Sequence, residues 1–248
     1  MFRRSKEEEA ALRQGEMTSF FRFPRTPHLA WLGAGRPRDD KVLTLAEAQE
    51  LMENPVVVEE KVDGANLGFS VDEHGTLRAQ NRGRYLDFAA LQDQWKPLKL
   101  WLSTRRDRLA DALFPDLMLF GEWCYAVHSV RYAHLPDWFL GFDVLDRSQG
   151  VFWSVDRRNE LAHQLDVAVV PELGRGHFSL GGLTELLGES RLTVGPAEGL
   201  YLRWEAERQL LQRAKLVRAE FVNAIEQHWS KRRLEENVIS PNPHRGAS

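Results

Sequence analysis

Short apolar runs alternate with polar turns through the central part of the chain. Their lengths and their content of β-branched and aromatic residues are typical of strands rather than helices. The predicted strands are 55–60, 65–71, 75–81, 117–123, 138–145, 150–155, 166–173 and 198–204. Between the second and third of these runs, Gly75 offers the positive φ that a hairpin turn needs.

Helical spacing marks most of the remaining segments. Thr44 is a candidate N-cap for a helix at 44–54. Further helices are predicted at 88–113, 156–165, 181–188 and 217–235. This order predicts an α+β fold with largely antiparallel sheets flanked by helices, because strands and helices do not alternate regularly. A doubly wound sheet is disfavoured, since no glycine-rich phosphate loop follows the first strand.

The chain has 248 residues, and residues 1–236 are expected to form a single domain. The charged residues 1–15 are expected to be flexible, and 237–248 to be a disordered tail. Cys124 is the only cysteine, which excludes an internal disulfide and favours a reducing compartment. Neither a signal peptide nor a run of about 18 apolar residues is present, so we expect a cytoplasmic protein without a membrane span.

Charge limits how the chain could bind nucleic acid. The net charge is −3, so such a partner would have to be met by a local basic patch. Arginine-rich stretches occur at 81–85, 103–108 and 230–233. The first follows a predicted hairpin and is a candidate for phosphate contacts. The other two are more simply explained as solvated helix faces.

The stretch Glu-Glu-Lys-Val-Asp-Gly, residues 59–64, places Lys61 at the end of a predicted strand. A lysine amine is nucleophilic only when neutral, and its ordinary pKa is about 10.4. Nearby cations or a metal ion would lower that pKa, whereas neighbouring carboxylates would raise it. Taken alone, Lys61 fits a solvent-exposed lysine beside a turn. A nucleophilic role requires a second basic cluster or a divalent ion close by.

Four later segments carry acidic, aromatic or basic side chains that could act together with Lys61. Glu122 closes a predicted strand, Phe142 stands beside Asp143, and Glu198 opens another strand. In 210–218, Arg213 and Lys215 lie two residues apart and share one face if the segment is extended. Each segment has a plain structural explanation as a strand end, a core aromatic or a solvated face.

In this order, the segments resemble the motifs of the covalent nucleotidyltransferase superfamily of DNA ligases, RNA ligases and mRNA capping enzymes. The likeness runs from about residue 55 to 220 and is closest to the ATP-dependent RNA ligases typified by the phage nick-sealing enzymes. Residues 59–68, including Asn66, are similar to the lysine motif of that branch. Residues 78–86 resemble its following arginine motif, and 23–29 resemble the N-terminal segment of some bacterial members. The resemblance implies a nucleotidyltransferase (adenylation) domain.

The resemblance also implies roles at the reacting phosphate. Lys61 would attack the α-phosphorus of ATP and become lysyl-AMP. Arg213 and Lys215 would neutralise the α-phosphate and lower the pKa of Lys61. Glu198 would hold a divalent ion, Mg²⁺ or alternatively Mn²⁺. Here the last motif reads Arg-x-Lys where many members have Lys-x-Lys, and arginine offers a planar fork instead of a flexible point charge.

The other implied residues would bind the nucleotide: Glu60, Asn66, Arg82, Glu122, Phe142 and Asp143. Glu60 would contact the adenine edge and Phe142 would stack on the purine. Glu122 and Asp143 would lie near the ribose or metal-bound waters. Arg82 would serve the ribose or the phosphate of a nucleic-acid end.

The implied function is an ATP-dependent RNA ligase that joins a 3′-OH to a 5′-phosphate, in nucleic-acid repair. Its partners would be RNA or RNA-containing duplexes, with an end-healing kinase or phosphatase as a further candidate. About thirty residues follow Lys215, so no C-terminal oligonucleotide-binding barrel is expected. A DNA ligase without its barrel and a non-catalytic nucleotide- or nucleic-acid-binding module remain the alternatives.

Overall fold

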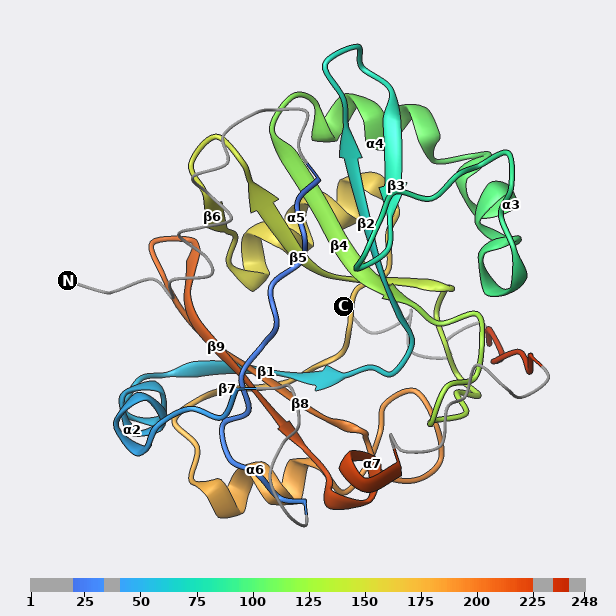
Figure 1. Cartoon of the computed structure of the whole chain (residues 1–248). Coiled ribbons are helices and arrows are strands. Elements are labelled where there is room, and N and C mark those ends of the chain that lie inside the picture. The colour runs from blue at the N-terminus through green and yellow to red at the C-terminus, as the bar shows by residue number, and fades with distance from the viewer. Residues whose placement is uncertain (1–19, 34–40, 225–233, 241–248) are drawn as a thin grey trace.

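The computed structural model describes residues 20–33, 41–224 and 234–240. Two antiparallel sheets organise this part of the chain (Figure 1). The five-stranded sheet has the order β3-β2-β4-β5-β6, with β2 Ala65–Val71, β3 Leu77–Gln80, β4 Leu117–Trp123, β5 Phe139–Asp146 and β6 Val151–Phe152. The four-stranded sheet has the order β7-β1-β8-β9, with β1 Val56–Lys61, β7 Glu172–Gly176, β8 Gly199–Ala206 and β9 Gln209–Val217.

Helices cover the outer side of each sheet (Figure 1). Those near the five-stranded sheet are the 3-10 helix η1 Asp93–Trp95, α3 Leu98–Leu102, α4 Arg106–Leu113 and α5 Val155–Leu165. Those near the four-stranded sheet are α2 Leu45–Glu53, α6 Leu180–Leu186 and α7 Ala219–Ala224. The predicted α+β fold with flanked antiparallel sheets is confirmed. None of the described helices is long and apolar enough to cross a membrane.

The chain passes from one sheet to the other directly after Lys61. β1 belongs to the four-stranded sheet, β2 belongs to the five-stranded sheet, and only residues 62–64 join them. At Gly64, an added Cβ would lie 2.7 Å from the carbonyl oxygen of Trp123, so any side chain would force the backbone to shift. The sequence therefore fixes Lys61 at the junction of the two sheets.

Alternation along β1 separates the outer core from the space between the sheets. Val56 and Val58 pack into a buried cluster with Leu51 of α2 and Leu183 of α6. The intervening side chains of β1 point to the opposite face, because successive residues of a strand alternate. The outer face is therefore apolar at Val56 and Val58, whereas the inner face carries Glu59 and Lys61.

Local signals predicted several elements correctly. Thr44 and Glu47 form a reciprocal capping box at the start of α2. Gly75 adopts a φ of +77° in the turn between β2 and β3. The helices predicted at 156–165 and 181–188 correspond to α5 and α6.

Other predictions were wrong in extent. The helix expected at 88–113 is three short pieces, since Asp93 takes a positive φ of 48° and Pro97 begins a new turn as the N-cap of α3. The strand expected at 166–173 starts only at Glu172, and Val169 forms a single bridge to Gly141.

The C-terminal predictions are partly corrected. The helix expected at 217–235 begins as α7 at Ala219, and its portion 225–233 lies outside the described residues. Residues 237–240 are not a disordered tail. Asn237 is buried and donates to the carbonyl oxygens of Cys124 and Ala126, and it accepts from the backbone N–H of Tyr132. The predicted flexibility of 1–15 and the tail 241–248 also lie outside the described residues.

Candidate active site

The inner face of the four-stranded sheet carries polar side chains in three rows. Strand pairing places Lys61 opposite Gly199, and Glu59 opposite Tyr201, which in turn lies opposite Lys215. The third row pairs Arg203 of β8 with Arg213 of β9. Because the strand period is two, these side chains share the face that looks toward the five-stranded sheet. A polar floor therefore runs from Lys61 to Arg213 between the sheets.

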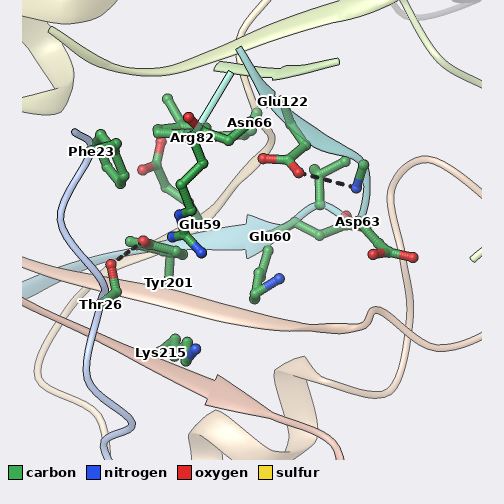
Figure 2. A pocket seen from close by; sticks show the side chains of 15 residues that line it. Phe23, Thr26, Glu59, Glu60, Asp63, Asn66, Arg82, Glu122, Tyr201 and Lys215 are labelled. Carbon is green, nitrogen blue, oxygen red and sulfur yellow. Dashed lines mark hydrogen bonds between the residues drawn. The ribbon is translucent and has the colours of Figure 1, made fainter. Parts of the chain in front are cut away.

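Lys61 lines a cavity of about 320 Å³ next to these rows. Figure 2 shows the side chains that line this cavity. It is lined by Phe23, Thr26, Glu59, Glu60, Lys61, Val62, Asp63, Gly64, Asn66, Arg82, Glu122, Phe142, Val170, Tyr201 and Lys215. Seven of the predicted site residues are in this set: Glu60, Lys61, Asn66, Arg82, Glu122, Phe142 and Lys215. The structure thus brings together residues that the sequence separates by more than 150 positions.

Lys61 lines the cavity and is held by Glu198, which is not itself one of the lining residues. The ammonium nitrogen donates to both carboxylate oxygens, with Nζ–Oε1 and Nζ–Oε2 distances of 2.8 and 2.6 Å. Burial lowers the pKa of Lys61, but the negative charges of Glu198, Glu122 and Asp63 outweigh it, so the net pKa is raised. Arg213 and Lys215 were expected to lower this pKa, but its net direction is upward because the carboxylate charges dominate. The ion pair with Glu198 therefore favours the protonated amine.

The charges of two further carboxylates, Glu122 and Asp63, also act on Lys61. Glu122 accepts from the backbone N–H of Gly64 at 3.1 Å, and Asp63 accepts from the backbone N–H groups of Ser129 and Val130. Burial raises the pKa of Glu122 to about 8, and the charges of Asp63 and Glu198 add to the effect of burial. The carboxylates therefore repel one another in a poorly solvated place.

This repulsion bears on metal binding. Among the described residues, no three histidine, cysteine, aspartate or glutamate side chains converge closely enough to hold a metal ion alone. Mg²⁺ is commonly held by one or two carboxylates, with substrate phosphates and water completing the shell. The oxygen donors around Lys61 fit that mode, and a divalent ion would relieve the like-charge repulsion.

Glu60 is fixed by a loop that the sequence did not single out. Its carboxylate accepts from the hydroxyl of Ser190 at 2.5 Å and from the backbone N–H of Arg191 at 2.7 Å. Burial raises the pKa of Glu60, while these two hydrogen bonds act in the opposite direction. The loop therefore holds the Glu60 carboxylate in one orientation at the cavity edge, where Phe142 and Val170 provide an apolar wall.

Asp143 and Arg213 were predicted to contact the nucleotide, but they do not line the cavity. The Asp143 carboxylate is fully buried and accepts from Nη1 of Arg203 at 2.6 Å and from Nη1 of Arg213 at 2.7 Å. The guanidinium carbon of Arg213 lies 4.8 and 4.5 Å from the ring centroids of Phe23 and Phe152. This pair is therefore part of the packing beneath the cavity, which corrects both assignments.

The Asp143–Arg213 pair belongs to a larger buried network that links the sheets and α5. Arg158 donates to Glu59 at 2.7 Å, and Arg203 also contacts Glu205 at 2.8 Å. Its members are three arginines and three carboxylates: Arg158, Arg203, Arg213, Glu59, Asp143 and Glu205. The charges balance, which is the condition for keeping so many ions away from water.

The N-terminal segment supplies residues that the sequence-based site missed. Phe23 and Thr26 line the cavity, and Thr26 shares a hydrogen bond with the hydroxyl of Tyr201 (Figure 2). The segment is held along β9, since the N–H of Lys215 donates to the carbonyl of Pro27 at 2.9 Å. The likeness of 23–29 to other proteins was the one signal that pointed here. Tyr201, Val170 and Asp63 had no comparable signal as lining residues.

The family of this chain follows from its likeness to known proteins. A family model described as RNA ligase matches residues 54–217. The chain belongs to the RNA ligase family. Among curated proteins, no sequence matches the chain.

Solved structures agree with the family in fold. A lysine-to-alanine mutant of Naegleria gruberi RNA ligase with ATP and Mn has a TM-score of 0.56 and 16% identity, over 81% of this chain and 57% of that enzyme. The same enzyme with PPi gives 0.53 and 18% identity, over 86% and 65%. A lysine-to-methionine mutant with AMP and Mn gives 0.54 and 18% identity, over 83% and 64%. The chain therefore spans less than two thirds of the length of these enzymes, and the likeness is one of fold.

Proposed function

We propose that this RNA ligase family member is an active ATP-dependent polynucleotide ligase that works through an AMP adduct on Lys61. The observation that carries the proposal is the position of Lys61, at the junction of the two sheets, paired with Glu198 and sharing one cavity with Lys215 and Arg82. A phosphoryl-transfer site depends mainly on positioning and charge neutralisation. These residues supply both.

The first step is nucleophilic attack by Lys61. Its amine must first lose a proton, and Glu198 is the nearest acceptor at 2.6 Å. Nζ then forms a bond to the α-phosphorus of ATP, while the bond to the oxygen bridging the α- and β-phosphates breaks and pyrophosphate leaves with the electron pair. Lys215 would balance negative charge on the α-phosphate. A divalent cation, when bound, would neutralise phosphate and carboxylate charge and so favour the neutral amine.

Residues of this chain would also bind the rest of the nucleotide. Glu60, oriented by Ser190, would accept a hydrogen bond from the adenine edge, and Phe142 would lie against the purine face. Asn66 and Glu122 would face the sugar side of the cavity. Arg82 is exposed at the cavity mouth, where an incoming nucleic-acid 5′-phosphate would meet it.

The later steps join two nucleic-acid ends. The 5′-phosphate of one strand attacks the phosphorus of lysyl-AMP, which releases Lys61 and forms an adenylylated end. The 3′-OH of the other strand then displaces AMP and forms the phosphodiester. We propose RNA, or duplexes containing RNA, as the substrate and repair as the process, with an end-healing kinase or phosphatase acting beforehand in the cytoplasm.

A panel of nicked duplexes tests the substrate. Each carries a 5′-phosphate and has ribose or deoxyribose on either side of the break, and sealing is followed with ATP and Mg²⁺. We expect efficient sealing only where the 3′-OH end is ribose. Equal sealing of an all-DNA nick would instead identify a DNA ligase. Failure to adenylylate any 5′-phosphate, with RNA still bound, would identify a non-catalytic binding module.

A further inference from the structure

A second cleft lies outside the cavity that contains Lys61. Its volume is about 510 Å³, and it is formed by α3, the start of α4 and the segment before η1. It is lined by Phe88, Lys99, Leu102, Ser103, Thr104, Arg106, Asp107 and Arg108. None of these residues has a role in the proposed adenylation chemistry.

The cleft carries unneutralised positive charge. Lys99, Arg106 and Arg108 are all exposed, and Asp107 is the one carboxylate on the cleft wall. Among the described residues, no ion pair involves these three cations. By contrast, the exposed Arg175 and Arg208 each pair with a carboxylate, at 2.6 and 2.5 Å. This difference is not predictable from residues 103–108 alone, because that stretch also fits a solvated helix face.

An aromatic ring lies among these cations. Phe88 is half-buried, and the guanidinium carbon of Arg106 lies 5.3 Å from its ring centroid. The exposed hydroxyl-bearing residues Ser103 and Thr104 lie on the same wall. Basic side chains that follow a sugar-phosphate backbone, combined with an aromatic face, are typical of single-stranded nucleic-acid grooves.

The chain connects the cleft to the cavity over a short and well-held path. Residues 82–88 run from Arg82 at the cavity to Phe88 at the cleft, and Figure 1 shows this part of the chain leading from β3 toward α3. Asn81 accepts from the backbone N–H groups of Gly83 and Arg84, both at 2.9 Å. The path is therefore fixed locally, and it presents exposed arginines along its length.

We infer that the α3–α4 cleft binds the sugar-phosphate backbone of the RNA strand whose end is joined at Lys61. The inference rests on the proposed ligase function for the presence of RNA at the cavity. Lys99, Arg106 and Arg108 contact the phosphates, and Phe88 supports a sugar or base beside them. The cleft thereby places the strand while Arg82 holds its end.

The test combines Lys99→Gln, Arg106→Gln and Arg108→Gln in one variant. A matched control carries Lys41→Gln, Arg175→Gln and Arg208→Gln, which removes three exposed cations elsewhere. Three readouts are compared with wild type: AMP adduct formation without RNA, the Kd for a 5′-phosphorylated RNA oligonucleotide across salt concentrations, and circular dichroism as a check on folding.

We expect the cleft variant to form the AMP adduct normally and to bind RNA at least ten-fold more weakly. The slope of log K against log salt should fall by about 2, since each lost phosphate contact on a single strand contributes about 0.7. The control variant should remain within two-fold of wild type. Equal RNA affinity in all three proteins, or equal losses in the cleft and control variants, would overturn the inference.

The same data separate the two proposals. If wild type forms no AMP adduct but the cleft variant still loses RNA affinity, the ligase function fails and the cleft stands as a nucleic-acid site. If the adduct forms normally and RNA affinity does not depend on the cleft, the ligase function stands and the cleft assignment fails.

Discussion

Asp143 joins two guanidinium groups in a part of the molecule from which water is excluded. Its carboxylate lies between Arg203 and Arg213, with N–O distances of 2.6 and 2.7 Å, and none of its surface is exposed. We predict that Asp143→Asn destabilises the fold without abolishing adenylation chemistry. The amide keeps the shape of the side chain but removes the charge that both arginines need.

The size of the predicted destabilisation depends on the partners that each arginine keeps in Asp143→Asn. Arg203 retains Glu205 at 2.8 Å, whereas Arg213 keeps its contacts with the ring faces of Phe23 and Phe152. Breaking a buried ion pair by removing one partner typically costs about 3–5 kcal/mol. For a chain of this size that corresponds to a Tm lower by on the order of 10 °C.

Urea unfolding, with adduct formation measured below the transition, separates this structural role from a ligand role. The double variant Asp143→Asn, Arg213→Met provides a control, because it removes the stranded cation and places a thioether between two aromatic rings. It should recover at least half of the lost unfolding free energy. The structural role of Asp143 would be excluded by an Asp143→Asn variant that unfolds within about 1 kcal/mol of wild type and no longer forms the adduct. That result would mean that Asp143 binds the nucleotide directly.

Three further predictions concern the cavity wall. Burial raises the pKa of Glu122 to about 8, so the folded state holds a proton that the unfolded state releases at about pH 4.3. The free energy of unfolding of the metal-free protein should therefore fall as pH rises from 5 to 8. Urea titrations should show a much shallower fall for Glu122→Gln, and an unchanged slope would exclude this cause. Gly64→Ala should reduce adduct formation at least ten-fold, since its Cβ would lie 2.7 Å from a backbone oxygen of β4. Gly83→Ala, whose Cβ would have its nearest contact at 3.7 Å, should behave as wild type. Equal rates of adduct formation in both variants would argue against a steric requirement at Gly64. Ser190→Ala should raise the KM for ATP about three- to ten-fold with little change in kcat, because Glu60 loses a positioning hydrogen bond. A fall in kcat alone would instead show that Ser190 affects the chemical step.

The secondary structure was predictable where a local signal decided the outcome. The capping pair Thr44 and Glu47 begins α2, and Gly75 turns the hairpin. Prediction of strands failed where an apolar segment could be buried either as a strand or as an irregular loop. Residues 167–171 are apolar and buried or half-buried, yet only one bridge, from Val169 to Gly141, connects them to β5, because burial does not require a continuous strand.

The site was predictable where its residues lie in ordered motifs. Lys61, Glu122, Phe142 and Lys215 meet at one cavity, as the motif order implied. The environment of Asp143 and Arg213 was not predictable, since it depends on β5 of one sheet facing β9 of the other. The pKa of Lys61 was predicted in the wrong direction for the same reason. The sequence does not reveal that the charges of Glu198, Glu122 and Asp63 dominate at the Lys61 amine.

The proposed mechanism requires that Lys61 becomes covalently linked to AMP. Intact-protein mass after incubation with ATP and Mg²⁺ measures this directly, and peptide mapping locates the added group. Protein as purified must be measured first, because an adduct already present would conceal turnover; treatment with pyrophosphate would remove it. We predict the mass of one AMP on Lys61, released by pyrophosphate and absent in Lys61→Ala. An AMP adduct on another residue, or none on protein shown to be free of it at the start, would exclude Lys61 as the nucleophile.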